Sequence, residues 1–117
     1  MTATAASKDA RADVRKILHC PVRIIAKNGN VIRGRSLDVS TGGMSVMLNE
    51  PFDGAPQCVV TFEALSASQL TNGKPISVTV AAEAVYSICV GTSGFRVGFK
   101  FDRSNEGAAK ALRQLLE

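Results

Sequence analysis

The chain has 117 residues, of which 45% are hydrophobic and 21% charged, and its formal net charge is +4. This length predicts a single domain that buries enough surface to fold without disulfides or a metal ion. The sequence has no apolar run of about 18 residues and therefore no predicted membrane span. Its positive net charge favours an anionic partner. Residues 1–10 are small and polar and lack the apolar stretch of a signal peptide, so we expect a flexible tail on a cytoplasmic protein.

Residues 11–117 form the predicted domain. Residues 11–18 have no clear period and predict either a helical turn or an extended arm. Beyond them, alternating apolar and polar residues predict six strands at about 20–27, 31–39, 44–49, 57–62, 76–89 and 95–102. The first two strands are separated by Asn28, Gly29 and Asn30, which predict a tight hairpin because these residue types tolerate positive φ.

The fifth strand is long enough that we expect it to bend. Its alternation predicts one face that runs from Ile76 to Tyr86 and Ile88. A short C-terminal helix follows the last strand, with Ser104 as the expected N-cap. Its predicted apolar face is made of Ala108, Ala111, Leu112, Leu115 and Leu116. Many short strands with glycine-rich turns indicate a mainly all-β sandwich or barrel.

No set of residues predicts catalysis or metal binding. Cys20, Cys58 and Cys89 are widely spaced and are interpreted as buried free thiols. His19 is the only histidine, and nothing near it in the sequence supplies a nucleophile or a carboxylate partner. We therefore expect a binding protein without a cofactor rather than an enzyme.

A short polar motif, D-x-S-x-x-G, runs from Asp38 to Gly43. If the strand alternation continues, Leu37 and Val39 face the core, and Asp38 and Ser40 point outward together. Gly42 and Gly43 would then allow positive φ or the close approach of a ligand. The alternative is a structural turn, in which Asp and Ser side chains bond nearby backbone amides.

A second motif, R-x-x-x-R, joins Arg11 to Arg15. A guanidinium group donates paired hydrogen bonds to phosphate or to the O6 and N7 acceptors of guanine. The carboxylate of Asp38 would accept from the N1–H and N2–H donors of guanine, so the two motifs together are suited to a guanine nucleotide. The alternative for the arginines is a solvated basic tail.

These two motifs, in this order and spacing, resemble the signature of the PilZ domain family, and the segment Phe95–Phe101 resembles a late strand of that family. The resemblance implies a six-stranded antiparallel β-barrel that binds cyclic di-GMP. It implies that Arg11 and Arg15 contact guanine and phosphate, and that Asp38 and Ser40 hold a guanine edge beside a close turn at Gly43. Many members carry a further arginine where this chain has Ala10, which leaves open whether one ligand or a stacked pair binds.

The expected function is thus a cyclic di-GMP receptor. Its N-terminal arm would change conformation on binding and signal to a downstream protein in motility, polysaccharide or virulence control. One alternative is a basic barrel that binds single-stranded nucleic acid, which the 5% aromatic content disfavours. Another is an adaptor that acts without nucleotide. Four further cations are interpreted as ordinary solvated charges: Arg33, Arg35, Arg96 and Lys100.

Overall fold

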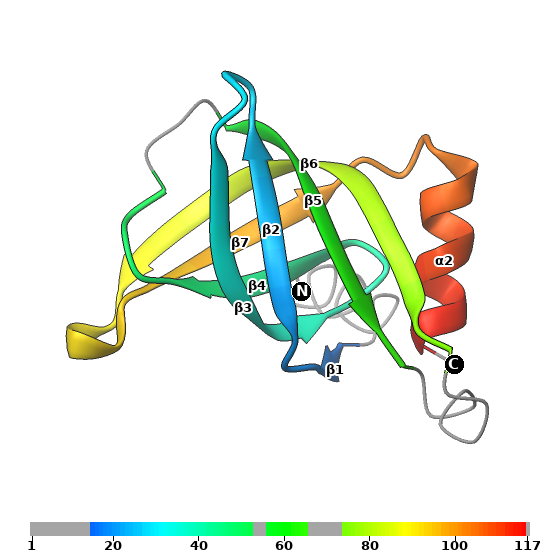
Figure 1. Ribbon diagram of the computed structural model, residues 1–117, viewed down its shortest axis with the longest axis horizontal. Coiled ribbons are helices and arrows are strands. Elements are labelled where there is room, and N and C mark those ends of the chain that lie inside the picture. Colours follow the sequence, from blue (N-terminus) through cyan, green and yellow to red (C-terminus); the bar gives the residue numbers. More distant parts are fainter. Residues whose placement is uncertain (1–14, 53–55, 66–73, 117) are drawn as a thin grey trace, which may run out of the picture.

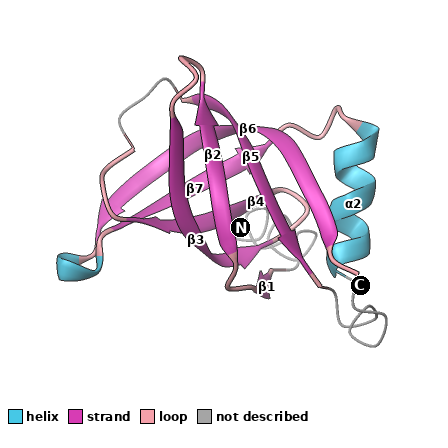
Figure 2. Ribbon diagram, viewed as in Figure 1, coloured by secondary structure: helices cyan, strands magenta, loops and turns pink. Residues whose placement is uncertain are grey.

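The computed structural model describes residues 15–52, 56–65 and 74–116. Within them the chain is mostly strand, with one short 3-10 turn and a C-terminal helix (Figure 2). The elements are β1 (Lys16–Ile17), β2 (Pro21–Ala26), β3 (Val31–Val39), β4 (Gly43–Leu48), β5 (Gln57–Ala64), β6 (Ile76–Cys89), η2 (Gly91–Ser93), β7 (Phe95–Phe101) and α2 (Glu106–Leu116). The expected tail at residues 1–10 lies outside the described residues.

Six of these strands close into an antiparallel barrel (Figure 1). Their order is β3-β2-β5-β6-β7-β4, and pairing of β4 back to β3 completes the ring. The predicted mainly β class and the six predicted strands are confirmed. The additional strand, β1, pairs with the end of β3, beyond the point where β2 begins. In residues 16 and 17 the chain is therefore extended rather than helical.

The hairpin between β2 and β3 forms as predicted. Gly29 has φ +93°, a conformation that costs glycine little because it has no Cβ. The backbone N–H of Asn30 donates to Oδ1 of Asn28 at 3.0 Å. This local chemistry fixes a register in which Ile25 faces Val31 and Pro21 faces Arg35.

The core fills the barrel and extends beneath α2 (Figure 1). Ala108, Leu112 and Leu115 are the buried residues of the helix, as its periodicity predicts. The predicted N-cap at Ser104 is wrong. Asn105 caps the helix instead, because its Oδ1 accepts a hydrogen bond from the N–H of Ala108 at 2.9 Å.

The long strand β6 contains an irregularity that reverses its faces. The register with β7 shifts between Ala84 and Tyr86, and an extra residue in one strand turns every later side chain to the opposite side. After the shift Tyr86 pairs with Gly98 and Ile88 with the exposed Arg96, so the predicted single face from Ile76 to Ile88 is wrong beyond Ala84. Cys89, near the tip of the same hairpin, is exposed rather than buried, whereas Cys20 and Cys58 are buried as expected.

Candidate functional site

Asp38 reaches the outer surface of the barrel through a bulge in β3. Burial alternates along this strand as far as Ser36, which is 1% exposed, and the register with β4 then shifts between Ser36 and Asp38. The extra residue, Leu37, is half-buried and lines a groove on the outer surface. The prediction that Leu37 faces the core is therefore wrong, while Val39 is buried as expected.

Ser36 fixes the segment that precedes β2. Its hydroxyl accepts a hydrogen bond from the N–H of Cys20 at 2.9 Å and donates to the carbonyl oxygen of Leu18. Between β1 and β2 these bonds add to two backbone hydrogen bonds, from the N–H of Leu18 to the carbonyl oxygen of Leu37 at 3.1 Å and from the N–H of Ser36 to that of Cys20 at 2.9 Å. They hold β1 against β3, so that Ile17 pairs with Asp38 and Arg15 lies beside it.

Two arginines flank the carboxylate of Asp38. Nη1 of Arg15 lies 2.6 Å from Oδ1, and Nη2 of Arg96 lies 3.7 Å from Oδ2. Arg96 belongs to β7 and reaches Asp38 across β4, where Ser45 and Gly98 are the facing pair. The sequence predicts an ordinary solvated charge at Arg96, and its ion pair with Asp38 corrects this prediction. No local pattern could have placed it here, because β3 and β7 meet only through their shared neighbour β4.

The segment from Ser40 to Gly43 is a tight turn built around a buried hydroxyl. Oγ of Ser40 accepts from the N–H groups of Gly42 and Gly43, each at 3.2 Å. The N–H of Ser40 donates to the carbonyl oxygen of Gly43 at 2.8 Å. Ser40 is 1% exposed, so it does not point outward with Asp38. Its hydroxyl has the structural role that the turn alternative describes.

Gly43 is needed for a close backbone approach rather than for positive φ. The described glycines with positive φ are Gly29, Gly91 and Gly94. A Cβ at Gly43 would lie 2.2 Å from the carbonyl oxygen of Phe99. Such a contact leaves no room for any side chain, and this is why the motif ends in glycine here.

A groove of about 880 Å³ begins at Arg15 and runs over this turn. This volume is within the range of small-molecule sites. Its charged lining residues are Arg15, Glu83, Lys100, Asp102 and Arg103. The pKa of Asp102 is lowered because its carboxylate accepts a hydrogen bond from the backbone N–H of Ser104. Asp102 therefore remains charged at neutral pH.

Arg11, the first arginine of the R-x-x-x-R motif, lies outside the described residues. Of the two motif arginines, the structure therefore places only Arg15 beside Asp38. Among the residues that the structure describes, no three His, Cys, Asp or Glu side chains are grouped closely enough to hold a metal ion. In the same residues no helix is long and apolar enough to cross a bilayer.

The fold and the site together define a small antiparallel barrel. Its outer surface carries the carboxylate of Asp38 between two arginines, next to a glycine-containing turn. The model of the PilZ domain matches residues 9–117. The chain therefore belongs to the PilZ domain family, as the two motifs suggest. A comparison with curated proteins finds no significant match.

Several solved structures share this fold. The chain is similar to the Bacillus subtilis inhibitor of motility MotI/DgrA, with a TM-score of 0.67 and 17% identity over 87% of this chain. It spans about half of that protein, 47% of its length. The PilZ domain of CeSA from a cellulose-synthesizing bacterium gives a TM-score of 0.59 and 18% identity, covering 87% of this chain and 93% of that one.

The PilZ domain of YcgR from Escherichia coli, a structure determined with c-di-GMP, also gives a TM-score of 0.59. Its identity to this chain is 12%, over 89% of this chain and 86% of that one. At identities this low the shared property is the fold. The roles of individual side chains must be argued from this chain's own geometry.

Proposed function

We propose that the chain is a receptor module that binds cyclic di-GMP on the outer surface of its barrel. The observation that carries the proposal is the carboxylate of Asp38 held between the guanidinium groups of Arg15 and Arg96. Membership of the PilZ family and the c-di-GMP complex of the similar YcgR domain support the same ligand.

In this proposal Asp38 selects the base. A carboxylate accepts hydrogen bonds from the N1–H and N2–H groups of guanine, while adenine presents an acceptor at N1 and would be repelled. Asp38 is only 21% exposed, and two cations hold it in place. The N–H donors of guanine would take the place of these cations, so the partly buried carboxylate keeps hydrogen-bond partners when the arginines move to the ligand.

The arginines neutralise the ligand's phosphates and contact the acceptor edge of guanine. Arg15 and Arg96 are each about half exposed, so they can turn from Asp38 to an incoming phosphate without leaving a buried charge unpaired. Lys100 and Arg103 line the adjoining groove and add positive charge to it. Arg11 is proposed as a further ligand contact from the N-terminal arm.

Ser40 and Gly43 contribute by shaping the turn. The hydroxyl of Ser40 orients the N–H groups of Gly42 and Gly43, and Gly43 lets this turn pack directly on β7. Ligand binding that draws Arg15 away from Asp38 would also move the segment before β1. We propose this movement of the N-terminal arm as the signal to a downstream protein in the cytoplasm.

Isothermal titration with cyclic di-GMP tests the proposal. We expect saturable binding, which also reports the stoichiometry, and a loss of about 5- to 150-fold in affinity for Asp38→Ala, because a good bidentate base contact contributes about 1–3 kcal/mol. Arg15→Ala should weaken binding as well, while Lys27→Ala, at an exposed cation in the β2–β3 turn, should not. No heat at tens of micromolar ligand, or an Asp38→Ala variant that binds normally, would overturn the proposal.

A further inference from the structure

A second cationic surface lies on the outer face of β2 and β3, away from the groove that contains Arg15. Arg23 on β2 is the direct cross-strand partner of Arg33 on β3, and Arg35 follows two residues later on the same face. All three side chains are exposed. Like charges placed directly opposite each other in a sheet destabilise it, so the fold alone gives no reason for this arrangement.

In the described part of the chain, no ion pair offsets this repulsion. Within residues 15–52, 56–65 and 74–116, no carboxylate lies within ion-pairing distance of these three arginines. This contrasts with Arg15 and Arg96, which share one carboxylate. One carboxylate, that of Glu63, lines a groove with Arg23 and Arg33 without forming an ion pair with them. A cluster that keeps a net positive charge is typical of a surface that meets an anionic partner.

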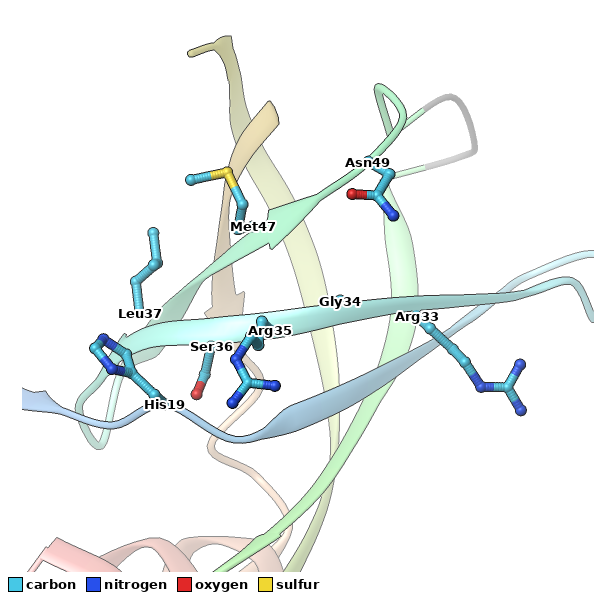
Figure 3. Close-up of a pocket in the computed structure, with 8 residues that line it drawn as sticks. All are labelled: His19, Arg33, Gly34, Arg35, Ser36, Leu37, Met47 and Asn49. Atoms are coloured by element: carbon cyan, nitrogen blue, oxygen red, sulfur yellow. The ribbon is translucent and has the colours of Figure 1, made fainter. Parts of the chain in front are cut away.

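A groove of about 520 Å³ lies beside Arg33 and Arg35 (Figure 3). Its other lining side chains include His19, the half-buried Leu37 and Met47, and its described lining contains no carboxylate. Figure 3 shows both guanidinium groups on the same side of β3, with Leu37 and Met47 projecting away from them. Met47 is the direct cross-strand partner of Arg35, so the groove has a cationic side formed by Arg33 and Arg35 and an apolar side formed by Leu37 and Met47.

We propose that this surface binds an extended acidic segment of a partner protein. Arg33 and Arg35 are two residues apart on one strand, so their Cβ atoms are about 7 Å apart, which is the spacing of alternate residues in an extended peptide. Acidic side chains at alternate positions of the segment therefore meet successive arginines, and an adjacent aliphatic side chain packs on Leu37 and Met47.

The composition of the surface favours a peptide over a nucleic acid. Single-stranded nucleic acids bind through aromatic side chains on which the bases stack, and the groove has no aromatic side chain among its described lining residues apart from the imidazole of His19. Arginine and methionine are both enriched in protein–protein interfaces. The inference goes beyond the proposed function, because none of its residues belongs to the Asp38 site.

The test selects random peptides displayed on phage against the immobilised full chain. We expect the enriched peptides to carry Asp or Glu at alternate positions next to an aliphatic residue. A labelled synthetic copy of the strongest peptide is then titrated in a fluorescence anisotropy assay. The double variant Arg33→Glu with Arg35→Glu should lower its affinity by about tenfold or more, equivalent to about 1.4 kcal/mol.

A matched double variant controls for net charge. Lys27→Glu with Lys110→Glu changes the charge equally at exposed residues elsewhere, and it should leave peptide affinity within about twofold. Equal losses of peptide affinity in the two double variants would mean that only the net charge of the protein attracts the peptide, and would overturn the inference. Enriched peptides without acidic residues would overturn it as well. Circular dichroism shows whether the Arg33→Glu/Arg35→Glu variant folds. If it does not, the variant Arg33→Gln with Arg35→Gln takes its place.

Two further measurements separate this inference from the proposed function. Arg33→Glu with Arg35→Glu should bind cyclic di-GMP like the unchanged protein, and Asp38→Ala should bind the peptide normally. A labelled oligothymidylate that binds more tightly than the peptide, and is lost in the Arg33→Glu/Arg35→Glu variant, would assign the surface to nucleic acid and overturn the inference.

Discussion

The hydroxyl of Ser40 provides the sharpest test of how the D-x-S-x-x-G motif works. Replacing Ser40 with Ala removes an oxygen that accepts from two backbone N–H groups, at Gly42 and Gly43. The residue is buried and Gly43 is buried as well, so water has little access to these donors. If the hydroxyl builds the turn, its loss should lower the free energy of unfolding.

The size of the effect follows from these contacts. A buried donor left unsatisfied costs about 1–3 kcal/mol, and the loss of a capping hydroxyl typically costs about 1 kcal/mol. Because the N–H of Gly42 is only partly buried, we expect a total of about 1–2 kcal/mol. With an unfolding entropy of about 2.1 cal/mol/K per residue, this lowers the Tm by about 4–8 °C.

Differential scanning calorimetry measures this change, and titration of the same variants with cyclic di-GMP measures their affinity. Ser87→Ala serves as the control, because Ser87 is an exposed serine on β6 and should leave the Tm unchanged. Asp38→Ala should show the opposite profile to Ser40→Ala. It should lose affinity strongly but lose little stability, because partly exposed ion pairs contribute about 0–1 kcal/mol.

An unchanged Tm for Ser40→Ala would refute the assignment of this hydroxyl to the turn. If the same variant also lost affinity by as much as Asp38→Ala, the hydroxyl would have to contact the ligand directly. That result would restore the expectation that Asp38 and Ser40 act on one guanine edge together.

Four other predictions follow from the structure. Arg96→Ala should weaken cyclic di-GMP binding by about fivefold, as expected for a partly exposed ion pair of about 1 kcal/mol; unchanged affinity in titration would remove Arg96 from the site. In a thiol-reactivity assay only Cys89 should react rapidly in the native protein, because Cys20 and Cys58 are buried and burial raises the pKa of Cys58 from 9.0 to about 11; two or three fast thiols would contradict this. Since the folded pKa of Cys58 is the higher one, its stabilising contribution is complete below about pH 9 and is lost as the pH rises toward 11, and chemical denaturation across this range should detect the loss. Arg33→Thr removes a like-charge cross-strand pair, so its Tm should equal or exceed that of the unchanged protein; a clear fall in thermal unfolding would indicate a structural role for Arg33.

Local chemistry in the sequence was sufficient for most of the strands and for the first hairpin. Alternation determines strands because side chains point to opposite faces with a period of two, and Asn28 with Gly29 specifies a turn through its own hydrogen bond and positive φ. The same alternation failed at the two register shifts. At Leu37 and again beyond Ala84, the residues on either side continue to look regular, although the partner strand requires an extra residue.

The candidate site was predictable in part. The two motifs predict that Asp38 and Arg15 serve one site, and the structure places them in an ion pair. The contacts of Arg11, Arg15, Asp38, Ser40 and Gly43 with a ligand stay predictions. The burial of Ser40 and the position of Arg96 depend on where β4 and β7 pass. Those positions result from closing the ring of strands, which brings together residues more than 50 positions apart. The sequence by itself determined which residue types and strands are present, and only the tertiary structure decided which side chains meet, because barrel closure and bulges are set by pairing between distant strands.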